Sequence, residues 1–581
     1  MANGFGTLFI GVSGLQSSQN ALNITANNLA NVDTAGYVRQ QVMFGDRNYL
    51  TFNTTAAISK QQSGLGVQIC DVVHTRDVFL DRLYRSESGR YSFYSATAEA
   101  AYEVETYFQE LEGVAFQGAL EDFWKSFEEF YKGPDDSVNQ NLVLQKAQLF
   151  ISRGKAIYDG LKSYQNNINT QISDDIDQIN ELGKSIYELN KAILSIEAGD
   201  LETAMTLRDA RDLALDELSS LVDITYTEQA DGVVKVSIEG TEFVDGARVY
   251  AMASRRDPST GFLTPYWPHL SNLNKDSYVN VFNFKNDISS ANGNDMGELK
   301  ALILARGDKV ANYTDVTGKT LDEYNNGAGM SVMMKAQAEF DQLMHGVITA
   351  LNDVFCPNDT ASAVYGTGAG FPITATAADG TQYTINADTK VLDVNNCSYG
   401  IDMKLPPREL FTRRGTERYT EVTANGETYY IYNEEDPEDT SKQYTVQSVS
   451  VNSELVDYEA LIPHLMKNGD VNQPMALKLS EEVWSRENLT LNPGDPRPCS
   501  IKTYYIAMSG EMATFENIYS SAASSLAGSV ASVDNQRQQV IGVSSDEELT
   551  KMIKFQNAYN ASSRFINVVN EMIEHLITQL G

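Results

Sequence analysis

The chain is 581 residues long, which exceeds what one hydrophobic core supports and predicts roughly three to five domains. Its 44 basic and 78 acidic residues give a net charge of −34, which repels nucleic-acid phosphates and anionic membrane surfaces. Because no segment is apolar enough to span a bilayer, we expect neither nucleic-acid binding nor membrane insertion.

The N-terminus is predicted to form a helix that carries almost no charge. Asp33 and Arg39 are the only charged side chains in residues 1–45, whereas a surface helix normally has one charged face. Leucines repeat every seven residues and asparagines at spacings of three and four, so each set lies on one stripe of the helix. The leucines are Leu8, Leu15, Leu22 and Leu29, and the asparagines are Asn20, Asn23, Asn27 and Asn31. The neutral amide stripe suits contacts between subunits, because it does not repel an identical neighbour.

Long helices are expected through the first half of the chain. Heptad repeats of apolar and aromatic residues predict helices at about 94–111, 118–131, 136–196 and 207–222. If residues 136–196 form one helix, it extends roughly 90 Å at 1.5 Å per residue. Gly154, Gly160 and Gly183 are points at which that helix could break.

Turn dipeptides predict where the chain changes to strands. Asp231-Gly232 predicts a hairpin after residue 223, and helix is expected again at about 296–306 and 331–355. Within 357–500, Asp379-Gly380 and Asn425-Gly426 each separate two alternating runs and predict two further hairpins. We therefore expect a β-rich insert at 357–500, with helix resuming near Glu511.

A second heptad pattern predicts a helix at the C-terminus. Ser545 followed by Glu548 predicts a capping box at its start. Apolar residues at alternate spacings of three and four, broken only by Ser562, predict a coiled-coil seam over roughly four heptads. These residues are Met552, Phe555, Tyr559, Ile566, Val569, Ile573, Leu576 and Leu580.

The order of these elements predicts an α+β, multidomain protein with a nested architecture. Residues 1–45 and 535–581 are expected to form a terminal assembly domain, in which the N- and C-terminal helices pair as an antiparallel coiled coil. Residues 46–356 and 501–534 are expected to form a long-helix bundle with a small β subdomain near 223–295. Residues 357–500 form the outer β-rich insert.

Motifs for catalysis or metal binding are weak. The five histidines form no H-E-x-x-H motif, and the acidic run at 433–439 lacks the spacing of an EF-hand loop. We therefore expect no catalytic, cofactor-binding or metal site. The four cysteines are widely spaced, which favours buried apolar thiols, although one long-range disulfide remains open. They are Cys70, Cys356, Cys397 and Cys499.

The stretch GLQSSQNALNITANNLANVDTAGYVRQQV, residues 14–42, closely resembles the N-terminal signature of bacterial flagellar rod, hook and hook-associated proteins. That signature reads A-N-N-[LI]-A-N-x-[DN]-T-x-G-[YF], and Asp33, Thr34, Gly36 and Tyr37 match its turn. Ala35 stands where the family often has proline. Residues 542–577 are similar to the family's C-terminal end, and 66–85, 207–246 and 297–308 resemble its members at the junction of hook and filament.

The resemblance implies a structural, non-enzymatic role with no cofactor. It implies self-assembly into a ring or helical tube in the flagellum, with the hook protein and a second junction protein as neighbours. It also implies an export chaperone at the C-terminal end and secretion through the flagellar type III apparatus. The N-terminal segment has no basic stretch and no A-x-A site, so we expect export without a cleavable signal peptide.

Two alternatives stay open. A hook-type or distal rod protein shares the terminal motifs, although the long helical block at 94–222 favours a junction member. The alternative of another class is a surface-exposed binding or enzymatic module in the 357–500 insert. Its support is the acidic run at 433–439 and the tyrosine-rich strand at 428–432, and aromatic residues in strands more often serve packing.

Overall fold

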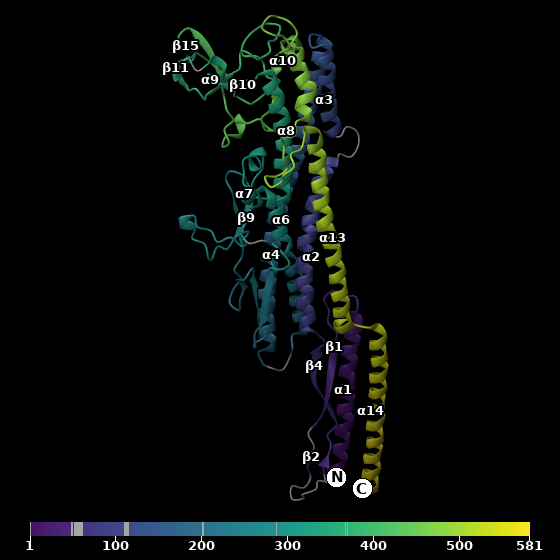
Figure 1. Ribbon diagram of the computed structural model, residues 1–581. Coiled ribbons are helices and arrows are strands. Elements are labelled where there is room, and N and C mark those ends of the chain that lie inside the picture. The colour runs from purple at the N-terminus through teal and green to yellow at the C-terminus, as the bar shows by residue number, and fades with distance from the viewer. Residues whose placement is uncertain are drawn as a thin grey trace.

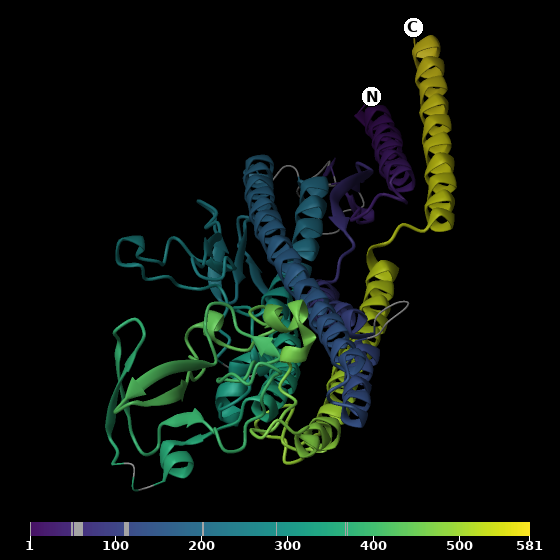
Figure 2. The ribbon, with the colours of Figure 1, turned by 90° about the horizontal axis from the view of Figure 1, so that it is seen from above.

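The two chain ends lie side by side at one end of an elongated molecule (Figure 1). The computed structural model describes residues 2–47, 50–51, 62–109, 116–199, 203–285, 288–366, 368 and 370–580. Helix α1 (Ala2–Ala30) runs toward the body and α14 (Ser545–Leu580) runs away from it, so the two helices are antiparallel (Figure 1). Viewed from above, both helices stand clear of the body (Figure 2).

A β-hairpin packs along α1. Strand β1 (Gln40–Asp46) pairs antiparallel with β4 (Val67–His74), from Gln40 opposite His74 to Asp46 opposite Val67. The short strands β2 (Leu50–Thr51) and β3 (Gln62–Ser63) also pair with each other. The sequence patterns did not predict these strands, because they carry no regular alternation of apolar and polar residues.

Helices of 5 to 61 residues form the body, and four of them are those that the heptads predicted. The helices of the body are α2 (Val78–Gln109), α3 (Phe116–Lys132), α4 (Ser137–Glu197), α5 (Met205–Leu221), α6 (Glu298–Arg306), α7 (Leu321–Asn325), α8 (Val332–Phe355) and α13 (Ile501–Ile541). The predicted end of the first helix near 111 lies outside the described residues. Helix α13 begins earlier than the predicted Glu511, because Ser500 and Thr503 form a capping box just before it.

Helix α4 is continuous through its three glycines, which serve close packing. A Cβ at Gly154 would lie 2.6 Å from Met344 Cε, and one at Gly160 would lie 2.7 Å from the Tyr107 ring. At Gly183 a Cβ would overlap the Phe243 ring. The glycines therefore allow neighbouring side chains to approach α4, and they do not break it.

The predicted hairpin after residue 223 is confirmed. Strands β5 (Ile224–Glu228), β6 (Val234–Ile238) and β7 (Thr241–Val244) form an antiparallel sheet, and Gly232 in the first turn has a φ of 81°. A further pair, β8 (Ala253–Arg256) and β9 (Leu263–Tyr266), follows. Short 3-10 turns connect this region: η1 (Leu273–Lys275), η2 (Tyr313–Asp315) and η3 (Ala328–Met330).

A six-stranded sheet lies at the end of the molecule opposite the two chain ends (Figure 1). Its order is β10-β13-β16-β15-β11-β12. The strands are β10 (Asn358–Thr360), β11 (Ile373–Ala377), β12 (Gln382–Ile385), β13 (Lys390–Leu392), β15 (Tyr419–Ala424) and β16 (Glu427–Tyr432), and α9 (Ala361–Tyr365) precedes β11. Both predicted turns are confirmed, and Asn425 and Gly426 have φ values of 54° and 85°, as a type I′ hairpin requires.

The expectation of a β-rich insert is wrong for residues 433–500. Apart from β17 (Ser450–Val451), which pairs with β14 (Phe411–Thr412), and isolated bridges, this part consists of loops and short helices. The helices are α10 (Ser453–Asp457), α11 (Gln473–Leu477), a π-helical turn (Lys478–Glu482), α12 (Val483–Ser485), η5 (Thr440–Lys442) and η6 (Glu459–Leu461). Tyr444, Leu455 and Trp484 are buried in the same core as the long helices, with the Trp484 ring 5.9 Å from that of Phe123. Burial against α3 and α8 orders this segment without a sheet.

The four cysteines are free, and only two fit the expectation of a buried thiol. Cys356 and Cys397 are buried, Cys499 is half-buried, and Cys70 on β4 is exposed. Cys70 lies on the terminal hairpin, away from the core of the body. Among the described residues, no helix combines the length and apolarity needed to cross a bilayer.

Candidate assembly site

Small residues, not leucines, form the most buried face of α1. A Cβ at Gly11 would lie 2.7 Å from Ile566 Cγ1, and one at Gly14 would lie 2.8 Å from Ser562 Oγ, so glycine is needed for α14 to approach. Ser13 donates to the Ile10 carbonyl and accepts from the Val67 amide of β4, so it links α1 to the hairpin. The predicted leucine stripe is half-buried beside this face: Leu8, Leu15, Leu22 and Leu29.

Most of the predicted C-terminal seam turns toward α1 and the hairpin. Val569 is 5 % exposed, and the Phe555 ring lies 6.0 Å from that of Phe44 on β1. The half-buried members are Met552, Phe555, Tyr559, Ile566 and Ile573. Leu576 is 51 % exposed, and the side chain of Leu580 lies outside the described residues. The seam therefore has buried and exposed members within one chain.

Asn28 is the amide around which the two ends are organised. Its Nδ2 donates to Glu548 Oε2 at 3.1 Å and to the Gln40 carbonyl at 2.9 Å. Its Oδ1 accepts from the Gln40 amide at 3.1 Å and from the Tyr37 hydroxyl at 2.8 Å. Asn28 lies in the A-N-N motif but off the predicted stripe, so spacing alone did not identify it.

The predicted capping box at Ser545 is wrong. The Glu547 amide donates to Ser544 Oγ at 3.4 Å, so Ser544 occupies the cap position. The Glu548 side chain is 1 % exposed and turns to Asn28, and Lys551 Nζ lies 2.6 Å from its other oxygen. The carboxylate joins two helices instead of capping its own.

The other motif residues stabilise the turn between α1 and β1. Asn31 Nδ2 donates to the Asn27 carbonyl at 2.9 Å, and Thr34 Oγ1 donates to Asn31 Oδ1 at 3.1 Å. Gly36 has a φ of 75°, which explains the glycine in the motif. Burial, with the nearby carboxylates Asp209 and Glu548, raises the pKa of Tyr37 to about 12, so it stays a hydrogen-bond donor at neutral pH. Asp33 is exposed, as are Asn20, Asn23 and Asn27.

An ion network ties this end to the body. Arg85 of α2 bonds two aspartates of α5, through Nε to Asp216 at 2.6 Å and through Nη2 to Asp212 at 3.0 Å. Arg76, between β4 and α2, reaches Asp212 at 2.6 Å and Asp81 at 2.6 Å. Because these groups are largely buried, removing one partner would leave an unpaired charge in the interior.

Arg537 extends the network to α13. Its Nε lies 2.8 Å from Asp81 Oδ1, its Nη2 lies 2.5 Å from Asp216 Oδ2, and its guanidinium stacks 4.7 Å from the centre of the Tyr84 ring. Asp81 and Asp216 belong to α2 and α5, so one arginine joins three helices. The network therefore fixes α13, from which α14 departs, to the body.

Asp209 of α5 connects the turn after α1 to the body. Its Oδ2 accepts from the Val38 amide at 3.2 Å, and its Oδ1 lies 3.4 Å from His74 Nδ1. Burial raises the pKa of Asp209 to about 7 and lowers the pKa of His74 to about 4. His74 is therefore neutral at pH 7, so its 3.4 Å contact with Asp209 is not an ion pair at that pH.

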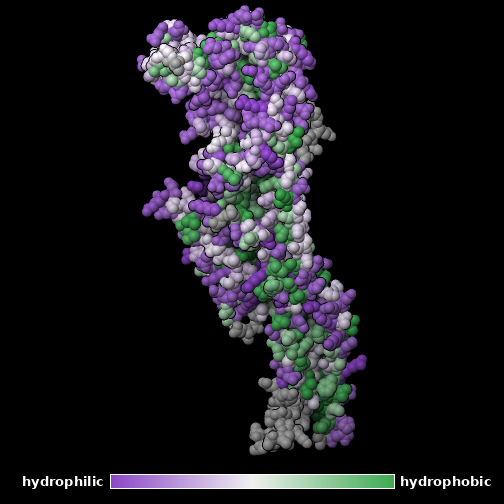
Figure 3. Space-filling view, in the orientation of Figure 1, coloured by the Kyte–Doolittle hydropathy of each residue, from purple (hydrophilic) through white to green (hydrophobic). Residues whose placement is uncertain are grey.

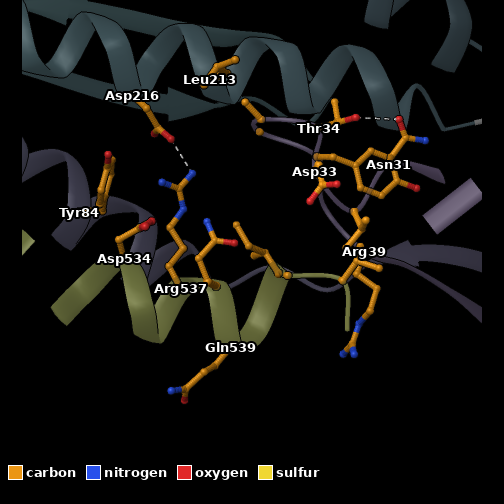
Figure 4. A pocket seen from close by; sticks show the side chains of 18 of the residues that line it. Asn31, Asp33, Thr34, Arg39, Tyr84, Leu213, Asp216, Asp534, Arg537 and Gln539 are labelled. Carbon is orange, nitrogen blue, oxygen red and sulfur yellow. Dashed lines mark hydrogen bonds and ion pairs between the residues drawn. The ribbon is translucent and has the colours of Figure 1, made fainter. Parts of the chain in front are cut away.

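A polar cavity of about 800 Å³ lies where these elements meet (Figure 4). The turn residues Asn31 and Thr34 line one side, with Asp216 and Arg537 opposite, and Glu547 at the start of α14 also contributes. The dashed lines in Figure 4 show that Asp216 and Arg537 are already paired. In the described part of the chain no group of three or more His, Cys, Asp or Glu residues is placed to hold a metal ion.

Residues from each of the two features that supported a binding module in the insert have partners within the fold. Glu435 of the acidic run accepts from the Tyr313 hydroxyl at 2.7 Å and pairs with His345 Nε2 at 2.9 Å. In the tyrosine-rich strand, Tyr429 and Ile431 are buried in the small core of the outer sheet.

Models of known protein families match the helical body and the two terminal segments of the chain. Residues 101–355 match the flagellar hook-associated protein FlgK helical domain, 8–37 match the flagella basal body rod protein family, and 537–580 match the flagellar basal body rod FlgEFG protein C-terminal family. The latter two segments coincide with α1 and its turn and with α14.

Two relatives that match over nearly the whole length of both chains carry the same name. The flagellar hook-associated protein 1 of Bacillus subtilis is 25 % identical over 570 residues, covering 98 % of this chain and 96 % of that protein. The protein of the same name from Escherichia coli is 21 % identical and covers 97 % and 98 %. Among solved structures, the flagellar hook junction protein FlgK from Burkholderia pseudomallei aligns with 79 % of this chain and 100 % of that chain, at 13 % identity and a TM-score of 0.45. By these matches, the chain is similar over nearly its whole length to flagellar hook-associated protein 1.

Proposed function

We propose that this chain assembles with copies of itself through α1 and α14, which pair as an antiparallel coiled coil. The chain is a structural component of the flagellar hook–filament junction and not an enzyme, as the family matches and the full-length relatives show. The full-length similarity to hook-associated proteins 1 is the observation that carries this function.

Exposed apolar side chains on the projecting helices support self-assembly. Phe9 of α1 is 57 % exposed, and on α14 Ile553, Met572 and Ile577 are 60 %, 66 % and 65 % exposed. Green surface accordingly follows the α14 edge of the projecting end in Figure 3. Burying each such side chain contributes about 1.5–3 kcal/mol, so a neighbouring subunit that covers them would stabilise the pair.

The charge distribution supports the same role. Only two charged side chains occur in residues 1–45 of a chain whose net charge is −34. Packing copies around the uncharged helix α1 keeps the acidic surfaces of the bodies apart. The predicted leucine, asparagine and seam residues are the interface we propose.

The finer expectations are part of the same proposal. We propose residues 1–45 and 535–581 as the assembly domain, 46–356 and 501–534 as the helical body, and 357–500 as the outer part. Strand β4 nevertheless packs beside α1, and Trp484 of the outer part shares the core of the body. The neighbours are the hook protein and a second junction protein, and an export chaperone holds the C-terminal end before secretion without a cleavable signal peptide.

Deletion of α14 tests the proposal. In host cells whose own copy of the gene is replaced, the full chain is expected in isolated hook–filament particles. A variant that lacks residues 545–580 is expected to leave hooks without filaments, since α1 loses its partner. A control variant, Thr384→Ser at an exposed strand position of the outer sheet, should assemble normally. Filament growth supported by the truncated chain would overturn the proposal.

A further inference from the structure

A stiff arm with an apolar tip projects sideways from the body. Residues 266–280 form a hairpin-like loop, in which the Trp267 amide donates to the Val279 carbonyl at 2.8 Å and the Asn272 amide donates to the Ser277 carbonyl at 2.8 Å. The buried Trp267 ring anchors its base. Both ribbon views show this segment reaching away from the helices (Figures 1 and 2).

The tip of this arm presents leucines to solvent. Leu270 and Leu273 are 51 % and 53 % exposed, and the second opens the turn η1. The turn itself is made of polar residues, 271–272 and 274–277, and the two leucines stand among them. Two aliphatic side chains at the end of a projecting loop indicate a contact with another surface.

A recess of matching chemistry lies in the body. It has a volume of about 340 Å³, and its walls come from the arm base, the end of α6 and the segment that leads from α7 into α8. Its apolar lining is Phe262, Phe282, Phe284, Leu304, Met330 and Met334. Figure 3 shows hollowed green surface over α6, α7 and β9. Since a cavity of about 150 Å³ accepts a benzene-sized group, this recess has room for two aliphatic side chains.

The buried side chain of Arg306, beside the recess, already has hydrogen-bond partners. Arg306 donates through Nη1 to Asn169 Oδ1 at 2.7 Å and to the Leu263 carbonyl at 2.8 Å, and its guanidinium lies 4.8 Å from the centre of the Phe262 ring. The recess therefore offers apolar surface and no unpaired charge from Arg306.

An arm cannot enter the recess of its own chain. Pro265 and Asn280, at the base of the arm, form part of the recess wall, while the tip points away from the body (Figures 1 and 2). Arm and recess lie at the same height along the long axis, to which α1 and α14 are parallel (Figure 1). A copy rotated about an axis in that direction would therefore present its arm at the height of this recess.

Charges at the two surfaces are complementary. Lys275 and Asp276 are exposed at the arm tip, and Arg255 and Asp308 are exposed at the rim of the recess. Both surfaces thus carry exposed charges of both signs beside their apolar side chains, so that Lys275 can meet Asp308 and Asp276 can meet Arg255. Oppositely charged rims around an apolar contact favour one register and one partner.

We propose that the arm tip of one copy docks in the recess of a neighbouring copy, with Leu270 and Leu273 inserted. The contact uses different surfaces on its two sides, so it continues from copy to copy around a ring or a tube. The inference rests on the proposed self-assembly and adds a second contact, far from the terminal helices.

Paired cysteines test the contact in hook–filament particles from host cells. Leu273→Cys at the tip and Asn326→Cys at the rim are combined with Cys70→Ser and Cys499→Ser, and the particles are treated with a short bismaleimide. A ladder of cross-linked multimers of this chain is expected. Either cysteine alone, or Leu273→Cys with the distant Asn468→Cys, should give no ladder.

A matched pair of tip variants provides the second measurement. Leu273→Asp should lower incorporation into particles roughly tenfold or more, because a buried leucine is replaced by a charge. Asn274→Asp adds the same charge beside it and should incorporate normally. Both purified variants should melt at the temperature of the parent chain, since both side chains are exposed.

The outcomes separate this inference from the proposed function. Normal incorporation of Leu273→Asp without any ladder would overturn the arm contact and leave terminal assembly standing. Cross-links from Leu273→Cys only to a different protein would also overturn it. Absence of even the parent chain from the particles would overturn both.

Discussion

Asn28 and Glu548, 520 positions apart in the chain, share a hydrogen bond of 3.1 Å at a point where each residue is 1 % exposed. This bond joins α1 to α14 at the place where both helices leave the body. It shows that the asparagine-rich motif has an internal role, because its most buried amide holds the two chain ends together.

Replacing Asn28 tests that role. Asn28→Asp places a second carboxylate against Glu548 in a buried site, and we expect it to destabilise the pairing of α1 and α14 by about 2–4 kcal/mol. Asn23→Asp adds the same charge at an exposed position and should have little effect. Hydrogen exchange of residues 545–580 in the purified chain measures the difference. Equal protection in both variants would contradict the role of Asn28.

The exposed Asn27 and the half-buried Asn31 of the same motif are predicted to act between subunits. Asn27→Asp and Asn31→Asp should reduce incorporation into the flagellum, since each adds a charge to a neutral packing face. The body should remain folded, which circular dichroism of the purified variants would establish. Incorporation at the level of the parent chain would count against a neutral interface.

Arg537 is expected to be the most sensitive member of the ion network. Arg537→Gln leaves Asp81 and Asp216 without this partner in a buried setting, so we expect a loss of about 3–5 kcal/mol in unfolding free energy. The exposed Arg414→Gln removes the same charge and should change stability by less than about 0.5 kcal/mol. Urea denaturation of the three proteins makes the comparison, and similar midpoints would refute it.

His74 predicts a dependence of stability on pH. Its pKa is about 4 in the folded chain and 6.5 when unperturbed, so the unfolded state takes up a proton first. As the pH falls from about 6.5 to about 4, the parent chain should lose about 3 kcal/mol relative to His74→Gln. If the difference in unfolding free energy between the parent chain and His74→Gln stays constant from about pH 6.5 to about pH 4, His74 is not buried in its neutral form.

Asp209 predicts the opposite slope. Its folded pKa of about 7 lies above the unperturbed 3.8, so the folded state takes up the proton first. Relative to Asp209→Asn, the parent chain should gain stability as the pH falls from about 7 to about 4. Plotted against pH, the difference in unfolding free energy between parent and His74→Gln and that between parent and Asp209→Asn should therefore have slopes of opposite sign. Slopes of the same sign would contradict the assignment.

Local patterns were sufficient for much of the secondary structure. The heptads of α4 and α14 and the turn residues Asn425 and Gly426 predicted their elements, because helical periodicity and a positive φ depend on neighbouring residues only. The same reasoning failed for residues 433–500, whose order comes from burial of side chains such as Trp484 against distant helices. It also failed for the glycines of α4, since the reason for each glycine lies on another element.

The amino-acid sequence by itself determined the terminal helices, the lack of charge on the N-terminal one and the family motif that joins α1 to β1. Only the tertiary structure decided which amide is buried, which carboxylate it meets, and that Arg537 joins α2, α5 and α13. It also decided that an apolar arm tip and an apolar recess lie at one height of the body. The physical reason is that periodicity fixes which face of a helix a residue occupies, whereas the partner of that face depends on how distant segments pack.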